Sequence, residues 1–300
     1  MRADELAAAL RADVTSRLMS PSRARPSLLR IALLTAATLA CFAANSLLCR
    51  AALGPRRADP ATFTLVRIAS GAVVLALVLA ARRARPAGGT LGSALALFVY
   101  AAAFSLAYVR IGAGVGALLL FAAVQVTMLG WSAVRGVRPR PLQVLGVGVA
   151  LAGLTWLAAP GASAPDPRGA ALMLAAGAAW GVYSLRGRAA GDPLATTAHN
   201  FLLSVPLAVA LGVAYARGAS ASPAGVALAV ASGALASGGG YSLWYAVVPA
   251  LGATRAAAVQ LAVPVLAGAG ATVFLGEQLT ARVGVAAVAI LAGIAVTLRR

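Results

Sequence analysis

Long apolar stretches alternate with short polar segments along almost the whole chain. Each stretch holds about 20 residues, the length that a helix needs to cross the hydrocarbon core of a bilayer. The segments between them carry glycine, proline and arginine, which end helices and anchor them at the membrane surface. The pattern predicts an all-α polytopic membrane protein with ten transmembrane helices, over residues 28–49, 61–81, 91–110, 112–134, 141–159, 169–186, 194–216, 224–249, 253–274 and 281–298.

The first 27 residues differ from the rest because they are polar and rich in arginine. Leu6, Leu10, Val14 and Leu18 recur every four residues, which fits a short amphipathic helix lying on the membrane surface. A disordered tail fits this segment equally well. The apolar stretch that follows is too long for the core of a signal peptide, so we interpret it as a retained first span.

The second half of the chain repeats the first at a shift of about 140 residues. The match is weak at single positions, but its order is preserved, and self-similarity of this kind indicates a repeat architecture. Equivalent positions include Ser46 and Ser184, Arg50 and Arg188, Asp59 and Asp192, Arg67 and Asn200, Phe104 and Tyr241, and Gly136 and Gly276.

An odd number of spans in each copy forces the second copy to enter the membrane upside down. Five spans per copy therefore predict two inverted five-helix repeats, an architecture typical of secondary transporters. The expected organisation is a cytoplasmic tail at 1–27, a first repeat at 28–159, a linker at 160–168 and a second repeat at 169–298.

Composition supports the membrane class and limits the chemistry. The chain is 61% apolar and 11% charged, which is atypical of soluble globular proteins. Its net charge of +18 comes from arginines at the ends of the apolar stretches, so we assign it to topology and anionic lipid rather than to nucleic acid. Two cysteines on one helix and a single histidine predict neither a disulfide framework nor a metal site, and no cofactor is expected.

The arginines also predict an orientation. Cytoplasmic loops of membrane proteins carry an excess of positive charge. Placing the N-terminus inside puts most of the arginines in the cytoplasm, and an even number of spans puts the C-terminus there as well. The cluster at Arg50–Arg57 argues against this orientation. We expect a bacterial inner-membrane protein with both termini cytoplasmic, as a monomer or a homodimer.

Short motifs recur in the second half of the chain: Ala179-Trp180-Gly181, Tyr183-Ser184, Asp192-Pro193, Gly252, Thr254-Arg255-Ala256, Gln260-Leu261, Pro264-Val265, Leu275-Gly276-Glu277 and Leu279-Thr280. These motifs resemble the EamA-like family of the drug/metabolite transporter superfamily. The resemblance covers about residues 28–298 and implies ten helices, alternating access and transport of small metabolites, often export. The first half departs from the family pattern at Val124 and Gln125, where the family usually has a proline, and at Val137, which replaces a glutamate.

Arg67 is the first candidate for binding a substrate. It lies about seven residues into the second span, roughly 10 Å deep at 1.5 Å per residue. An arginine at the centre of a membrane helix costs about 2.5–3.5 kcal/mol. Its planar guanidinium suits a carboxylate or another anionic group in a cavity. Snorkelling to the headgroups, or a structural bond to a neighbouring carbonyl, is the alternative.

His199 and Asn200 occupy the equivalent depth in the seventh span. A histidine can relay a proton near neutral pH, so proton-coupled transport is one interpretation. A histidine that only satisfies a hydrogen bond within the helix bundle is the other.

Aromatic and amide side chains near the bilayer midplane complete the candidate site. Phe104 with Tyr100, and Tyr241 with Trp244, each form a pair about one helical turn apart. They line a substrate cavity or pack helices together, and both readings stay open. Gln125 and Gln260 within spans, and Asn45 near a span end, contact substrate or join two helices.

Gly238, Gly239 and Gly240 interrupt an otherwise regular apolar span directly before Tyr241. We expect a hinge or a close helix contact there, and a second hinge at Pro264. Glu277 ends the ninth span and is expected to cap a helix or to pair with Arg282.

The sequence therefore predicts a secondary transporter of a small polar or zwitterionic metabolite, working by alternating access. A lipid-linked flippase subunit is the main alternative. A membrane scaffold is disfavoured by the polar residues within spans. An intramembrane enzyme is disfavoured because no nucleophile and base face each other: His199 and Ser204 are five residues apart on one helix.

Overall fold

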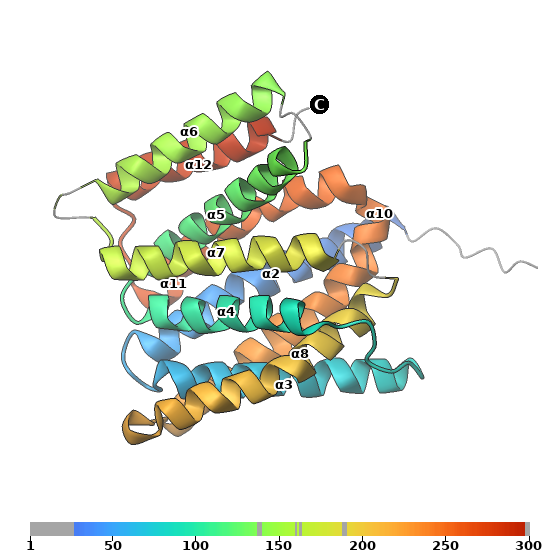
Figure 1. Cartoon of the computed structure of the whole chain (residues 1–300). Coiled ribbons are helices and arrows are strands. Elements are labelled where there is room, and N and C mark those ends of the chain that lie inside the picture. The colour runs from blue at the N-terminus through green and yellow to red at the C-terminus, as the bar shows by residue number, and fades with distance from the viewer. Residues whose placement is uncertain (1–26, 137–139, 160, 162–163, 188–190, 298–300) are drawn as a thin grey trace, which may run out of the picture. The chain divides into compact units, whose positions relative to one another are not determined.

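The computed structural model is helical throughout the part of the chain that it describes, residues 27–136, 140–159, 161, 164–187 and 191–297. Contacts divide the chain into Met1–Leu33 and Leu34–Arg300, and the account below concerns the second unit. The predicted amphipathic helix over Leu6–Leu18 lies outside the described residues. The elements (Figure 1) are α2 (Leu28–Leu53), α3 (Pro60–Ala81), α4 (Leu91–Tyr108), α5 (Ala113–Val134), α6 (Pro141–Ala158), α7 (Pro167–Gly187), α8 (Pro193–Ala214), η1 (Ala216–Gly218), α9 (Pro223–Val230), η2 (Ala231–Gly239), α10 (Gly240–Gln260), α11 (Ala262–Leu275) and α12 (Ala281–Thr297).

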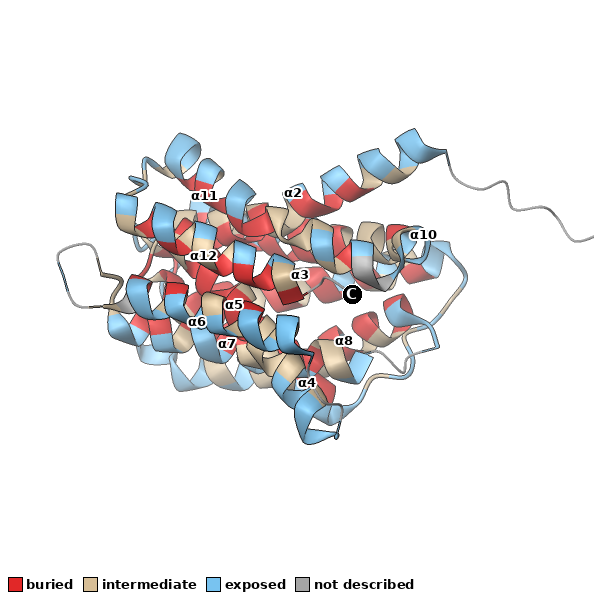
Figure 2. Ribbon diagram, turned by 90° about the horizontal axis from the view of Figure 1, so that it is seen from above, coloured by how far each residue is buried: buried red, intermediate tan, exposed pale blue. Residues whose placement is uncertain are grey.

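Seven helical segments in the described part of the chain are long and apolar enough to cross a membrane, and α6 and α12 are apolar but shorter. Apolar side chains such as Val73, Leu77 and Phe274 expose more than half of their surface. Figure 2 shows exposed residues on outward helix faces and buried residues between helices. The all-helical expectation is confirmed, while ten crossing helices stay a prediction. The seven segments are Leu28–Leu53, Pro60–Ala81, Leu91–Tyr108, Ala113–Val134, Pro193–Ala214, Pro223–Gly252 and Arg255–Leu275.

Equivalent helices of the two halves begin in the same way. Asp59 Oδ1 accepts two backbone N–H groups from the first turn of α3, both at 2.9 Å. Asp192 Oδ1 accepts two from the first turn of α8, at 3.0 and 3.1 Å. Each aspartate is followed by a proline, which needs no hydrogen bond at the first helical position. The internal alignment of these two positions thus has a local structural counterpart.

Equivalent helices also end in the same way. Gly136 follows α5 with φ of 81°, and Gly276 follows α11 with φ of 66°. This left-handed conformation ends many helices and favours glycine, which has no Cβ to clash with the backbone.

Helices from the two halves pack against each other in equivalent pairs: α3 against α8, α5 against α11, and α6 against α12. Figure 1 shows α6 and α12 lying side by side along their length. A Cβ on Gly146 would lie 2.5 Å from the Gly293 carbonyl oxygen, and a Cβ on Gly293 equally close to the Gly146 carbonyl oxygen. Small residues therefore let these two backbones touch, as is common between membrane helices.

The eighth predicted span is not a regular α-helix. It runs from α9 through the nine-residue π-helix η2 into α10, so that Gly238 and Gly239 end the π-helix and Gly240 begins α10. The expectation of a regular helix around the three glycines is wrong. An almost uniformly apolar segment carries too little periodicity to distinguish i→i+4 from i→i+5 bonding.

Two further interruptions of the helices lie at Gly252 and just before Pro264. Gly252 has φ of 70° and ψ of 165° and separates the eighth span from the ninth. The ninth span then breaks at Leu261, three residues before Pro264. Proline has no N–H for the carbonyl four residues earlier, here that of Gln260, which accounts for a break at this point.

Candidate functional site

A cavity of about 580 Å³ lies between helices of both halves. Its walls come from α2, α4, α5, α6, α7, α8, η2, α10, α11 and α12. Among the residues expected to bind substrate, those that line it are Tyr100, Phe104, Gln125, Asn200, Tyr241, Trp244 and Gln260. Arg67 and His199 do not line it, although both are close to residues that do.

Aromatic rings form a continuous cluster along the cavity wall. Trp180 on α7 is central: its ring centroid lies 4.9 Å from that of Tyr100, 5.3 Å from that of Tyr183 and 5.7 Å from that of Tyr241. Tyr100 also contacts Phe104 at 5.4 Å, as the helical spacing predicts. Trp180 therefore joins Tyr100 to Tyr241, and Phe42 of α2 joins Tyr241 to Trp244, with ring centroids 5.9 and 5.8 Å away.

Arg67 is buried behind this cluster. Its guanidinium carbon lies 5.2 Å from the centre of the Tyr100 ring and 4.9 Å from that of Phe104, within cation–π distance. Its Nη2 donates to the Tyr100 hydroxyl at 3.0 Å. Its Nη1 has no hydrogen-bond partner, and no ion pair among the described residues includes Arg67. Only 3% of the residue is exposed, so snorkelling to the headgroups does not describe it.

The Tyr100 hydroxyl connects Arg67 to a polar network that crosses between the halves. Asn45 Nδ2 donates to this hydroxyl at 3.4 Å, and Asn45 Oδ1 accepts from Ser232 Oγ at 2.5 Å. The four side chains come from α2, α3, α4 and η2, and all are buried. Asn45 thus joins helices while it also lines the cavity.

His199 and Asn200 hold the start of α4. The backbone N–H of Gly89 donates to His199 Nδ1 at 3.1 Å, and that of Thr90 donates to Asn200 Oδ1 at 3.0 Å. These bonds occupy one ring nitrogen of the histidine and the amide oxygen of the asparagine.

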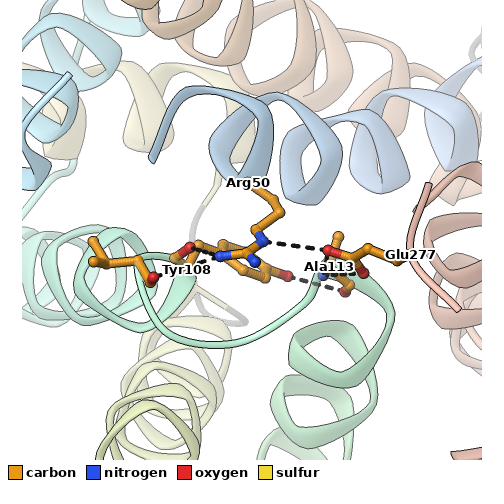
Figure 3. A network of polar contacts seen from close by, with 5 residues as sticks. Arg50, Tyr108, Ala113 and Glu277 are labelled. Atoms are coloured by element: carbon orange, nitrogen blue, oxygen red, sulfur yellow. Dashed lines mark hydrogen bonds and ion pairs between the residues drawn. The ribbon is translucent and has the colours of Figure 1, made fainter. Parts of the chain in front are cut away.

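A second cluster lies at the opposite ends of α5 and α11 from their cavity residues. Glu277 accepts the Ala113 backbone N–H at 3.0 Å through Oε1 and 2.8 Å through Oε2, which caps α5 (Figure 3). Arg50 Nε contacts Glu277 Oε1 at 3.3 Å, and Arg50 Nη1 donates to the Tyr108 carbonyl at 2.8 Å. We call Arg50, Tyr108, Ala113 and Glu277 the latch, because it joins the ends of α2, α4, α5 and α11.

The expected ion pair between Glu277 and Arg282 is wrong. Glu277 does cap a helix, but the helix is α5, and its ion pair is with Arg50. Arg282 donates instead to the Ala159 carbonyl at 2.5 Å and lies over the Trp156 ring. Proximity in sequence favoured Arg282, whereas the pair that forms spans 227 positions.

The loops before α3 and α9 meet at this same end. Asp59 and Ser220 exchange bonds: the Asp59 N–H donates to the Ser220 carbonyl at 2.7 Å, and the Ser220 N–H donates to Asp59 Oδ2 at 2.9 Å. Burial raises the pKa of Asp59, but hydrogen bonds from Thr62, Ser220 and Ala61 outweigh it and leave the pKa below its ordinary value.

The cavity reaches the other end of the helices. Its lining includes residues in the first or last turns of five helices, and these turns lie at one end of the bundle. They are Ser132 on α5, Gln143 on α6, Gly187 on α7, Pro193 on α8 and Thr297 on α12. The site is therefore open at the end where α5, α7 and α12 finish and latched at the end where α5 begins.

Several lining residues were not predicted as site residues, namely Trp180, Tyr183, Thr197, Ser237 and Tyr245. The repeat carried the signal for some of them. Tyr183 is the equivalent of Asn45, and Ser237 is the equivalent of Tyr100. Among the described residues, no group of three His, Cys, Asp or Glu side chains could hold a metal ion.

Comparisons with known proteins agree with this architecture. Residues 167–299 match the EamA-like transporter family. An uncharacterized protein of Pseudomonas aeruginosa is 51% identical over 271 residues, which cover 90% of this chain and 94% of that protein. One solved crystal structure has a TM-score of 0.60 at 20% identity and covers 87% of this chain and 97% of its own, which shows a shared fold.

Two relatives have names that state an activity. The threonine/homoserine exporter RhtA of Salmonella typhimurium is 37% identical over 172 residues, 54% of this chain and 57% of the exporter. That of Escherichia coli is 35% identical over 149 residues, 47% of this chain and 49% of the exporter. These matches span about half of each exporter. The chain belongs to the EamA-like transporter family of the drug/metabolite transporter superfamily, and it is a multi-pass membrane transporter rather than an enzyme.

Proposed function

We propose that the protein exports small zwitterionic amino acids with uncharged side chains by alternating access, and that Arg67 binds the substrate carboxylate. The observation that carries this proposal is the unpaired Nη1 of a buried guanidinium. A buried charge without a partner is strongly destabilising, so such a group is retained where a ligand supplies the partner. A planar fork with a free donor matches a carboxylate.

The rest of the site favours a zwitterion over a simple anion. The aromatic cluster around Trp180 and Tyr241 offers ring faces that attract an ammonium group. The described lining contains no acidic side chain, so a substrate with net positive charge has nothing to offset repulsion from Arg67. The RhtA relatives are named as exporters of threonine and homoserine, which are zwitterionic amino acids with uncharged side chains.

In this conformation Arg67 is separated from the cavity by Tyr100 and Phe104. The Tyr100 hydroxyl occupies Nη2, and we propose that the carboxylate takes the free Nη1 when this ring turns aside. In the conformation described, the Tyr100 hydroxyl accepts a bond from Asn45 of α2, so a turn of this ring on substrate binding would change a contact with α2.

The orientation that the arginines predict is compatible with export. With both termini in the cytoplasm, the open end of the cavity faces the cytoplasm and the latch faces the outside. Substrate then loads from inside, and its release requires the latched end to open while the other end closes.

The test is uptake of labelled threonine into proteoliposomes by the wild type, Arg67→Gln and Arg67→Lys. Removing one partner of a buried charged contact costs about 2–5 kcal/mol, so Arg67→Gln should lower kcat/KM by about 30-fold or more. Arg67→Lys keeps the charge without the fork and should stay well below wild type. Arg110→Gln removes a partly exposed arginine whose ion pair with Asp166 measures 3.8 Å, and it should leave transport unchanged.

Equal amounts of each variant in the membrane, with comparable melting temperatures, separate a lost contact from misfolding. If Arg67→Gln transports threonine at the wild-type rate, the carboxylate assignment is refuted.

A further inference from the structure

We infer that Ser237 is a substrate-contact residue that hydrogen-bonds an uncharged polar group, such as a side-chain hydroxyl, on the transported molecule. This inference rests on the proposed function and adds to it a residue that determines specificity. Ser237 is buried, with 2% of its surface exposed, and it lines the cavity. Its Oγ and Arg67 Nη1 are the two buried side-chain polar atoms without a hydrogen-bond partner in the described part of the chain.

Other serines of these helices donate to their own backbone. Ser184 donates to the Trp180 carbonyl at 2.8 Å, and Ser242 donates to the Gly238 carbonyl at 2.8 Å, each four residues earlier. This is the usual way in which a serine satisfies its hydroxyl inside a helix. Ser237 lies within the π-helix η2, where hydrogen bonds run over five residues instead of four. The changed offset leaves its hydroxyl free for another partner.

The internal repeat shows what is special about this position. Its equivalent in the first half is Tyr100, whose hydroxyl bonds both Arg67 and Asn45. A serine at the same place is too short to span that distance, and it contributes a hydroxyl but no ring. The first half therefore closes its polar network with a tyrosine, while the second half leaves a hydroxyl without a partner in a residue of the cavity lining.

The surroundings of Ser237 are polar but uncharged. Arg67 corresponds in the second half to Asn200, which lines the cavity and whose Oδ1 is engaged by Thr90. Thr197, also in the lining, is bonded to Tyr245 at 2.9 Å and to Tyr183 at 3.3 Å. These groups already have partners, whereas the buried Ser237 hydroxyl has none. A hydroxyl both donates and accepts, which suits a hydroxyl or amide on the ligand and gives no preference for charge.

The test is a cycle of two proteins and two substrates. Threonine and valine are nearly the same shape and differ by a hydroxyl in place of a methyl group. A hydrogen bond of ordinary strength predicts that Ser237→Ala lowers kcat/KM for threonine about three- to tenfold. Valine transport should change less than twofold. Ser237→Thr keeps the hydroxyl and should retain discrimination between the two substrates.

Ser242→Ala is the matched control. Ser242 lies five residues further on, it is partly buried, and its hydroxyl bonds the backbone outside the cavity lining. This variant should leave the ratio of threonine to valine transport at the wild-type value. Equal losses for both substrates in Ser237→Ala, no loss for either, or the same change in Ser242→Ala would overturn the inference.

Arg67→Gln, measured in parallel, keeps the two proposals apart. If Arg67→Gln transports threonine normally while Ser237→Ala lowers transport of threonine relative to valine, the assignment of the carboxylate to Arg67 is wrong and the role of Ser237 is supported. If Arg67→Gln loses transport and Ser237→Ala keeps the wild-type ratio of threonine to valine transport, the carboxylate assignment is supported and the role of Ser237 is wrong. If the wild type moves neither amino acid, both proposals are rejected.

Discussion

Glu277→Gln is the most informative change at the latched end of the protein. It keeps the size of the side chain and removes its charge. The carboxylate now receives the Ala113 N–H and the Arg50 guanidinium, and it lies at the N-terminus of α5, where the helix dipole favours an anion. The amide oxygen of glutamine can still accept the Ala113 N–H, so the variant loses mainly the ion pair with Arg50 and the interaction of the negative charge with the dipole of α5.

The size of that loss follows from the exposure of the pair. The two side chains are 27% and 23% exposed, so the ion pair is partly screened and contributes about 0.2–1 kcal/mol. An anion at a helix N-terminus adds about 0.3–1 kcal/mol. Together they stabilise the latched end by about 0.5–2 kcal/mol. If the latch opens during transport, Glu277→Gln should raise the ratio of open to closed forms about two- to thirtyfold.

Spin labels at Pro55 and Phe274 would measure this ratio. Both residues are exposed, and both border the space around Arg50 and Glu277 at the latched end. In a variant without native cysteines, the distance distribution between the labels should gain a longer component on Glu277→Gln. Arg110→Gln breaks a different ion pair and should not change the distribution. An unchanged distribution in Glu277→Gln, with unchanged transport, would refute the idea that this contact restrains opening.

Four further predictions concern the rest of the chain. Gly239→Ala should fold normally, because its Cβ would meet only the Ala234 carbonyl oxygen at 3.6 Å; a hinge then predicts retained binding with slower turnover in transport assays. Gly238→Ala places a Cβ 3.0 Å from Val74 and should lower the melting temperature. The lowered pKa of Asp59 stabilises the fold above the ordinary carboxyl pKa, and this contribution is lost as pH falls through the lowered value; Asp59→Asn should therefore melt earlier at neutral pH and converge with wild type in acid. A reporter active only outside the cell should be silent when fused after residue 300 and active in the loop at 160–167, and a bright C-terminal fusion would contradict the predicted orientation.

The sequence could predict the helices because membrane spans are specified locally. About 20 apolar residues suffice to indicate one, and the Asp59–Pro60 and Asp192–Pro193 pairs mark starts that the structure confirms to within a residue. Gly252 likewise marks a turn between two spans. Each of these signals depends on neighbours in the chain.

The misses all depend on positions far apart in the chain. The partner of Glu277 was wrongly predicted because four helix ends must be brought together before Arg50 comes within reach. The π-helix was missed because its register is set by what it packs against: a Cβ on Gly238 would meet Val74 of α3, and one on Gly240 would meet Cys41 of α2. Trp180 was quoted only as part of a family motif, yet its ring joins the aromatic residues of both halves.

The differences between the halves have a common direction. The first half buries a cation, Arg67, where the second half has the uncharged Asn200. The second half has a carboxylate at Glu277, whereas the equivalent residue of the first half is Val137, which has none and lies outside the described residues. A symmetric inverted repeat would give its two end states equal energies, because exchanging the halves converts one state into the other. Within the described part of the chain the latch lies at one end only, and this asymmetry removes that equality. If the C-terminus is cytoplasmic, the extra stabilisation favours the state that is open to the cytoplasm, which is the state in which an exporter waits for substrate.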